Sequence, residues 1–130
     1  MRVVFDTNIF ISALIFPNSS AEKAVLKIIE GRDELIMSHN IIDEVLTVLS
    51  NKFNRNREAL SRTAVNLAEI ATMVKPKERI SILRDEPDNR IIECAIAGKA
   101  DAIVTGDKEM LQLGKCGEIR MITLKHYLAI

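Results

Sequence analysis

The chain has 130 residues, enough for one domain with a buried core, and 48% hydrophobic and 28% charged residues are typical of a globular protein. Its 18 basic and 18 acidic residues cancel, which argues against a globally basic nucleic-acid-binding protein but leaves a local basic patch open. Aromatic residues make up only 4% of the chain, so a platform of stacked aromatic rings is not expected as the main mode of nucleic-acid binding.

Short apolar runs typical of buried strands alternate with segments of helical periodicity. In the first half we expect a strand at 2–5, a helix at about 8–14, a turn at 17–18, a helix at 20–30, a strand at 35–37 and a helix that begins at Ser38 or Asn40 and runs through Leu49. In the second half we expect a polar, basic segment at 51–57, a helix at about 57–73, a segment at 74–83 with a short strand on one or other side of Pro76, a turn at 85–88, a helix at 88–98, a strand at 102–104, a helix at 107–113, a strand at 119–122 and a helix from about 124. This alternation predicts a parallel sheet covered by helices on both faces.

The N-terminal region shows no signal peptide, and its apolar stretch at 3–16 is too short to span a bilayer and is interrupted by polar residues at 6–8. Cys94 and Cys116 do not have the spacing of a metal-binding pair, so we expect free thiols. These features predict a cytoplasmic protein with no membrane association.

Two acids follow predicted strands. Asp6 comes directly after the apolar run at 3–5, and Asp107 follows the strand at 102–104 after Thr105 and one glycine. In open α/β sheets, ligands bind beyond the carboxyl ends of the strands, so both acids are expected at the edge where sites form. Each also has a simpler explanation, Asp6 as a turn residue and Asp107 as a helix N-cap. Asn8 and Thr105 add polar groups that either support a site or cap a helix.

Two further acids lie on predicted helices. Asp88 lies on the apolar face of its helix, so its carboxylate is expected to point inward, with an N-cap as the alternative. Asp85, three residues earlier, either supports that acid or is exposed. Glu44 lies on the shoulder of an apolar arc and Asp43 nearer to solvent, which slightly favours Glu44 as an inward acid over a solvated one.

Clustering would give these acids a shared chemistry. Asp6, Glu44, Asp88 and Asp107 each have a route to one edge of the sheet. Two carboxylates about 4 Å apart repel by roughly 4 kcal/mol at an effective dielectric constant of about 20, so the group must protonate, pair with a base or bind a cation. The two His residues show no ligand spacing, and an oxygen-only ligand set suits Mg²⁺ or Mn²⁺, ions well suited to phosphoryl chemistry.

The stretches VVFDTNIFISAL, IIDEVLTVL and DEPDNRIIECAIAGKADAIVTGD, with the chain length, resemble a PIN domain, and most closely the small prokaryotic VapC-type toxins. The resemblance covers nearly the whole chain and is weakest at 51–80. It implies one domain over residues 1–130 with a three-layer α/β/α sandwich around a central, mainly parallel sheet. It also implies a Mg²⁺- or Mn²⁺-dependent endoribonuclease.

The resemblance carries the family's acidic quartet onto Asp6, Glu44, Asp88 and Asp107. Asn8 and Thr105 correspond to the polar residues that accompany the first and last acids. The third position depends on alignment among Asp85, Glu86 and Asp88, and the inward helix face favours Asp88. Our hypothesis is that the three aspartates hold one or two ions for hydrolysis of RNA phosphodiesters, and that Glu44 is a ligand or orients the attacking water.

Partners follow from the same resemblance and from the basic segment. Lys52, Arg55 and Arg57 either steer the RNA backbone or form a solvated loop. VapC-type toxins are neutralised by an antitoxin protein and are often homodimers, so the resemblance implies a toxin–antitoxin pair and a homodimer.

Two other functions stay open. A haloacid-dehalogenase-like phosphatase also has a strand followed by Asp and a late Gly-Asp. Here Asn8 stands in place of that family's second acid, and Glu109 but no Asp follows Asp107. The third possibility is a PIN-like module that binds RNA or protein without cleaving it.

Overall fold

The computed structural model describes residues 1–130 and contains six strands and seven helices. Their bounds are β1 (Arg2–Phe5), α1 (Thr7–Ile15), α2 (Ser20–Ile29), β2 (Glu34–Met37), α3 (His39–Phe53), α4 (Arg57–Ile70), β3 (Ala71–Met73), α5 (Glu86–Ala97), β4 (Ala102–Val104), α6 (Lys108–Leu113), β5 (Lys115–Cys116), β6 (Ile119–Ile122) and α7 (Leu124–Ala129). None of the helices is long and apolar enough to cross a membrane.

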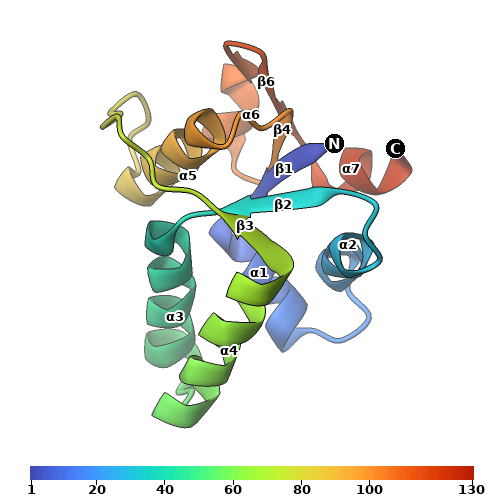
Figure 1. The fold of residues 1–130 in the computed structure, drawn as a ribbon, viewed down its shortest axis with the longest axis vertical. Coiled ribbons are helices and arrows are strands. Elements are labelled where there is room, and N and C mark those ends of the chain that lie inside the picture. The colour runs from blue at the N-terminus through green and yellow to red at the C-terminus, as the bar shows by residue number, and fades with distance from the viewer.

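One six-stranded sheet forms the centre of the fold, in the order β3-β2-β1-β4-β6-β5. All neighbouring strands pair in parallel except β5 and β6, which are antiparallel. Figure 1 shows α5 on one side of the sheet, α1 and α2 on the other, and α3 and α4 as a hairpin that extends away from the sheet. The predicted α/β/α sandwich with a mainly parallel sheet is therefore confirmed.

The strand order reverses direction at the centre of the sheet. The chain runs outward from β1 to β2 and β3, and then returns through α5 to place β4 on the other side of β1. Such a reversal between adjacent parallel strands leaves a crevice at their carboxyl ends, where ligands bind in α/β proteins. The boundary between β1 and β4 is thus the position at which the fold favours a site.

The core explains why the strands read as continuous apolar runs. Val3, Val4 and Phe5 of β1 are fully buried, as is every residue of β4. A strand covered by helices on both faces has no side exposed to water, so alternation between apolar and polar residues is lost. The core cluster contains 31 buried residues, and the ring of Tyr127 on α7 packs edge-on against Phe5.

The expected helix at 57–73 was wrong at its C-terminal end. α4 stops at Ile70, and residues 71–73 form the edge strand β3, which pairs with Leu35–Met37 of β2. Main-chain hydrogen bonds to β2 outweigh the helical periodicity of the sequence, and the Thr72 hydroxyl donates to Glu34 at 2.8 Å. Pro76 follows three residues after the strand.

Three other boundaries also differ from the expectations. Residues 85–88 are not a turn before a helix, because α5 already begins at Glu86 and accommodates Pro87 in its first turn, where a missing N–H costs nothing. The segment 51–57 is mostly helical, with only residues 54–56 between α3 and α4. The two-residue strand β5 was not expected from the sequence.

Candidate functional site

The strands β1 and β4 bring Asp6 and Thr105 together. Phe5 is in register with Val104, and the Asp6 N–H donates to the Val104 carbonyl at 2.9 Å. The Thr105 hydroxyl donates to Asp6 Oδ2 at 2.7 Å. Asp6 is only 4% exposed and Thr105 is fully buried, so this bond fixes the carboxylate at the floor of the crevice.

Asp6 and Asp107 are also helix caps. Asp6 Oδ1 accepts from the Asn8 N–H at 3.2 Å at the start of α1, and Asp107 Oδ2 accepts from the Met110 N–H at 2.9 Å at the start of α6. The Asp107 N–H in turn donates to the Thr105 hydroxyl at 3.0 Å. Thr105 therefore links the two acids, and the structural and functional explanations of Asp6 and Asp107 are compatible.

Asp88 joins this group from the first turn of α5, where it is 8% exposed. Asp85 occupies the N-cap position without a side-chain cap hydrogen bond and is itself exposed. A cavity of about 320 Å³ opens beside these side chains, and no hydrophobic residue lines it. Its lining residues are Arg84, Asp85, Asp88, Asp107 and Glu109.

Burial and neighbouring negative charges raise the pKa values of Asp6 and Asp88. Burial raises the pKa of Asp6, the charges of Asp107 and Asp85 add to it, and the hydrogen bonds from Thr105 and Asn8 oppose it. Burial, followed by the charges of four acids, raises the pKa of Asp88 to about 7, and no hydrogen bond lowers it. The four acids are Asp6, Asp107, Asp85 and Glu109.

Positive charge within the chain compensates this group only weakly. Arg84 lines the same cavity, but its side chain is 94% exposed and its Nε lies 4.0 Å from a Glu109 oxygen. An exposed ion pair of this kind contributes little. The cavity therefore has an excess of negative charge that a bound cation would neutralise.

A hard divalent cation fits the chemistry of these donors, because all of them are carboxylate or hydroxyl oxygens. The side-chain positions fit less well, because no three Asp, Glu, His or Cys residues lie close enough together to coordinate one ion. The fit thus rests on oxygen donors, burial and mutual repulsion, and coordination requires side-chain movement toward a shared ion.

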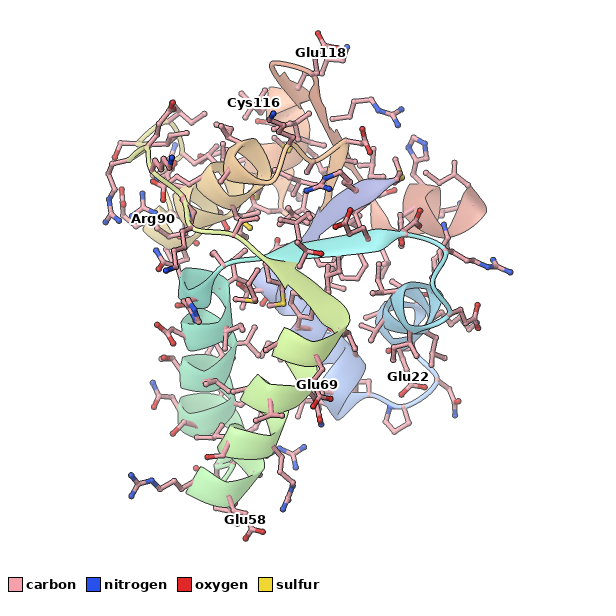
Figure 2. All side chains as sticks on the ribbon, viewed as in Figure 1. Glu22, Glu58, Glu69, Arg90, Cys116 and Glu118 are labelled. Atoms are coloured by element: carbon pink, nitrogen blue, oxygen red, sulfur yellow. The ribbon has the colours of Figure 1, made fainter.

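Glu44 lies in a neighbouring cavity. It is half-buried on α3, whereas Asp43 is exposed, and it lines a cavity of about 200 Å³ with Thr7, Glu86 and Arg90 among its neighbours. Figure 2 shows Arg90 on α5 beside the segment at 74–83. The structure thus groups Asp6, Asp85, Asp88 and Asp107. Glu44 lines a different cavity, which also borders the start of α5.

Arg90 is held among acids. It pairs with Glu86 at 3.2 Å and Glu93 at 2.9 Å and donates to the Ile80 carbonyl at 2.8 Å. The buried Glu93 in turn accepts from the Ile80 N–H at 2.7 Å. Segment 74–83 therefore covers the side of α5 opposite its apolar face, and Arg90 contributes little free positive charge to the cavity of Glu44.

The other sequence candidates lie farther out. Asn8 is exposed at the start of α1. Lys52, Arg55 and Arg57 are exposed at the end of the α3–α4 hairpin, where Figure 2 also shows Glu58. The hairpin extends away from the sheet, so these bases do not line the acidic cavity.

Sequence reasoning missed Glu109 and Asn89. Glu109 lies two residues after Asp107 and lines the same cavity. Its place in the first turn of α6, directly after the N-cap Asp107, is a sequence signal that could have identified it. Asn89 is fully buried, and its Oδ1 accepts from the Ile82 and Leu83 N–H groups at 3.1 and 2.8 Å. It thereby fixes the loop that precedes Asp85, and no sequence pattern distinguishes it from a surface Asn.

These features define an α/β/α protein with a buried acidic site at the switch point of its sheet. Residues 2–109 match the sequence model of the PIN domain. The chain therefore belongs to the PIN-domain family, as the sequence resemblance predicted.

Known proteins agree with this assignment. The chain is 32% identical over 117 residues to an uncharacterized protein of Methanocaldococcus jannaschii, covering 87% of this chain and 75% of that protein. A chain of VapBC-1 from nontypeable Haemophilus influenzae superposes with a TM-score of 0.68 at 18% identity, covering 96% of this chain and 99% of the other. A chain of Rickettsia felis VapBC2, bound to a DNA fragment from its promoter, gives 0.64 at 14% identity, covering 95% and 98%. The fold is thus that of chains in VapBC complexes.

Proposed function

We propose that the protein is a Mg²⁺- or Mn²⁺-dependent endoribonuclease. The observation that carries this proposal is the group of Asp6, Asp88 and Asp107 at the switch point, where two buried carboxyls have raised pKa values and lack a compensating base. Without a bound ion, nothing neutralises the repulsion among these carboxylates. Such a site is typical of one that binds a cation. Membership of the PIN family favours this chemistry over that of a phosphatase.

The lining of the acidic cavity and the Thr105 hydrogen bond support the roles in this proposal. Asp6, Asp88 and Asp107 hold the ion, and Asp85 and Glu109 add negative field at the mouth of the cavity. A bound divalent cation would supply charge neutralisation and polarisation of the phosphodiester. Thr105 orients Asp6 through its 2.7 Å bond and so fixes the direction in which that carboxylate would face a bound ion.

Glu44 and the hairpin bases have outer roles in this proposal. Glu44 orients the attacking water or becomes a ligand when the neighbouring cavity rearranges, since it is not part of the acidic cavity. Lys52, Arg55 and Arg57 bind the backbone of RNA long enough to reach the hairpin end. Their substitution by Ala should weaken binding of a structured RNA and leave cleavage of a hexanucleotide unchanged.

Cleavage of a pool of structured RNAs with Mn²⁺, Mg²⁺ or chelator tests the proposal. We expect ion-dependent products from the wild type, none from Asp6→Asn or Asp107→Asn, and wild-type cleavage from the matched control Asp43→Asn. Hydrolysis of small phosphomonoesters without RNA cleavage would support the phosphatase instead. Ion-independent RNA binding without cleavage would support the non-catalytic module.

The biological setting is proposed from the VapBC likeness. We propose that the protein is the toxin of a toxin–antitoxin pair in the cytoplasm, acts as a homodimer and is neutralised by a small protein encoded next to it. Co-expression with the product of the adjacent gene should rescue growth and yield a stable complex. Growth that is unaffected by expression of the active chain alone would remove the toxin assignment.

A further inference from the structure

A third cavity lies against the chain segments that carry Asp6 and Asp107. It has a volume of about 400 Å³, within the range of about 300–1,000 Å³ that is usual for small-ligand sites. Asn8 and Gly106 line it, and these residues lie two positions after Asp6 and one before Asp107. A ligand in this cavity therefore lies against the same peptide segments that carry the acids.

The lining of this cavity differs chemically from that of the acidic cavity. No charged side chain lines it, whereas all five residues of the acidic cavity are charged. Its apolar surface comes from Ile9 and Leu124 among others, and the amide of Asn8 and the hydroxyl of Ser12 provide polar groups. An uncharged, planar group that also forms hydrogen bonds suits this lining, and a phosphate does not.

An exposed aromatic ring borders the cavity. Phe16 is 57% exposed, and the other aromatic residues are buried except for Phe53 at 37%. Phe16 is the C-cap of α1, where its N–H donates to the Ser12 carbonyl at 2.9 Å, and in the loop that follows the Asn18 N–H donates to Glu22 at 3.1 Å. Figure 2 shows Glu22 on the first turn of α2. The backbone that carries the ring is therefore anchored at the cavity, and the exposed ring is available to stack on a base.

We infer that this cavity binds the nucleobase next to the scissile phosphate, with Phe16 stacking on the base and Asn8 and Ser12 contacting its edge. This subsite rests on the proposed nuclease function. One aromatic ring serves one base, in agreement with an aromatic-poor sequence that offers no stacking platform. The cavity thus selects single-stranded RNA, because a base must leave its helix to enter.

The test combines substitutions in the protein with removal of single bases from the RNA. A single-stranded RNA that is cleaved at one bond is compared with a series in which each base in turn is removed and its ribose and phosphate remain. We expect Phe16→Ala to raise KM by about 5- to 150-fold, the range for one lost base–aromatic stack. Removing the base beside the cleaved bond should raise the KM of the wild type equally.

The two losses should not multiply, because both remove the same contact. Phe16→Tyr keeps the ring and should retain the wild-type KM. Ile29→Ala is the matched control, since Ile29 is 58% exposed on α2 outside the cavity. Independent losses from Phe16→Ala and from every missing base, or an unchanged KM in Phe16→Ala, would overturn the subsite.

A binding measurement separates the subsite from the nuclease proposal. The four nucleoside 5′-monophosphates, added with chelator, should shift the amide resonances of Asn8, Ser12, Phe16 and Gly106 in a ¹⁵N–¹H spectrum. These shifts without RNA cleavage would sustain the subsite and refute the nuclease. RNA cleavage without these shifts, and with no effect of Phe16→Ala on KM, would refute the subsite alone. The subsite would also be refuted if Phe16→Ala abolished binding of a protein partner and left KM unchanged.

Discussion

Replacement of Asp88 by Asn should stabilise the apoprotein while abolishing RNA cleavage. The carboxyl of Asp88 has a pKa of about 7 in the fold, against 3.8 for an unperturbed Asp side chain. Holding it ionised therefore costs up to about 4 kcal/mol. Water at the cavity mouth screens part of this electrostatic cost, and the Asn amide introduces N–H donors that need partners of their own. We therefore expect Asp88→Asn to raise the free energy of unfolding by about 1–3 kcal/mol near pH 8.

The pH dependence gives the prediction its sign. Because the folded pKa lies above the unfolded one, the folded state holds more protons between about pH 4 and 7, and wild-type stability falls as pH rises through this window. The advantage of Asp88→Asn should thus be greatest near pH 8 and should shrink toward pH 4. Urea unfolding in chelator at several pH values measures it, and a gain of about 1–3 kcal/mol corresponds to roughly 3–15 °C in Tm.

Mn²⁺ provides the converse measurement. The ion should stabilise the wild type near pH 8, less near pH 5, and scarcely affect Asp88→Asn, because binding competes with protons for the carboxylates. Asp43→Asn, an exposed acid on α3, is the control and should behave as the wild type. Equal destabilisation of Asp88→Asn at all pH values, or an equal response of both proteins to Mn²⁺, would refute the reasoning.

Three further substitutions test other parts of the fold. Thr105→Val removes the hydroxyl that orients Asp6 and should lower kcat/KM by about 10- to 100-fold. It also leaves the Asp107 N–H without its acceptor, so it should cost about 1–3 kcal/mol of stability, and Thr105→Ser should restore most of both losses. Gly98→Ala should cost about 1–3 kcal/mol in urea unfolding, because a Cβ there overlaps a side chain of β2; a neutral effect would mean that β2 yields. Burial alone would raise the pKa of Asp33, but hydrogen bonds from Tyr127 and the N-terminal amine outweigh it and lower the pKa. Tyr127→Phe should therefore cost about 1–3 kcal/mol near pH 7, and this loss should diminish as acid protonates Asp33; a loss independent of pH would assign it to packing instead.

The sequence predicted the acids at the sheet edge because strand ends and ligand sites coincide in α/β folds. The short buried strands placed Asp6 directly after β1, and Asp107 three residues after the end of β4. It could not show that β1 and β4 are adjacent, since their pairing joins residues 99 positions apart. The Thr105 hydrogen bond to Asp6 likewise became visible only in three dimensions.

Glu44 illustrates the limit of helical periodicity. A helical-wheel projection of residues 39–53 favoured Glu44 over Asp43 as the inward acid, and in the structure Glu44 is half-buried and Asp43 is exposed. A wheel gives the angle of a side chain about the helix axis but not the position of the helix relative to the sheet. Because α3 packs beside α5, Glu44 faces a cavity with Arg90 and Glu86 rather than the cavity of Asp88.

Residues 71–73 illustrate a second limit. Their apolar residues continue the period of α4, and nothing local ends that helix before Pro76. The strand forms because the edge of β2 offers unpaired main-chain groups, which the sequence of residues 57–73 does not encode. Long-range pairing of this kind overrides local propensity, and short edge strands are where it does so most readily.

The caps at Asp6 and Asp107 decide how loss of activity can be interpreted. Each carboxylate accepts a main-chain N–H at the start of its helix, and Asn is as good an N-cap as Asp. Substitution by Asn therefore keeps the cap and removes the charge, whereas Ala would remove both and cost about 1 kcal/mol of stability. At Asp6 the amide must also face the Thr105 hydroxyl, which accepts as well as donates. Inactive but folded Asn variants would thus attribute the loss to the missing charge, and so to the ion that it holds.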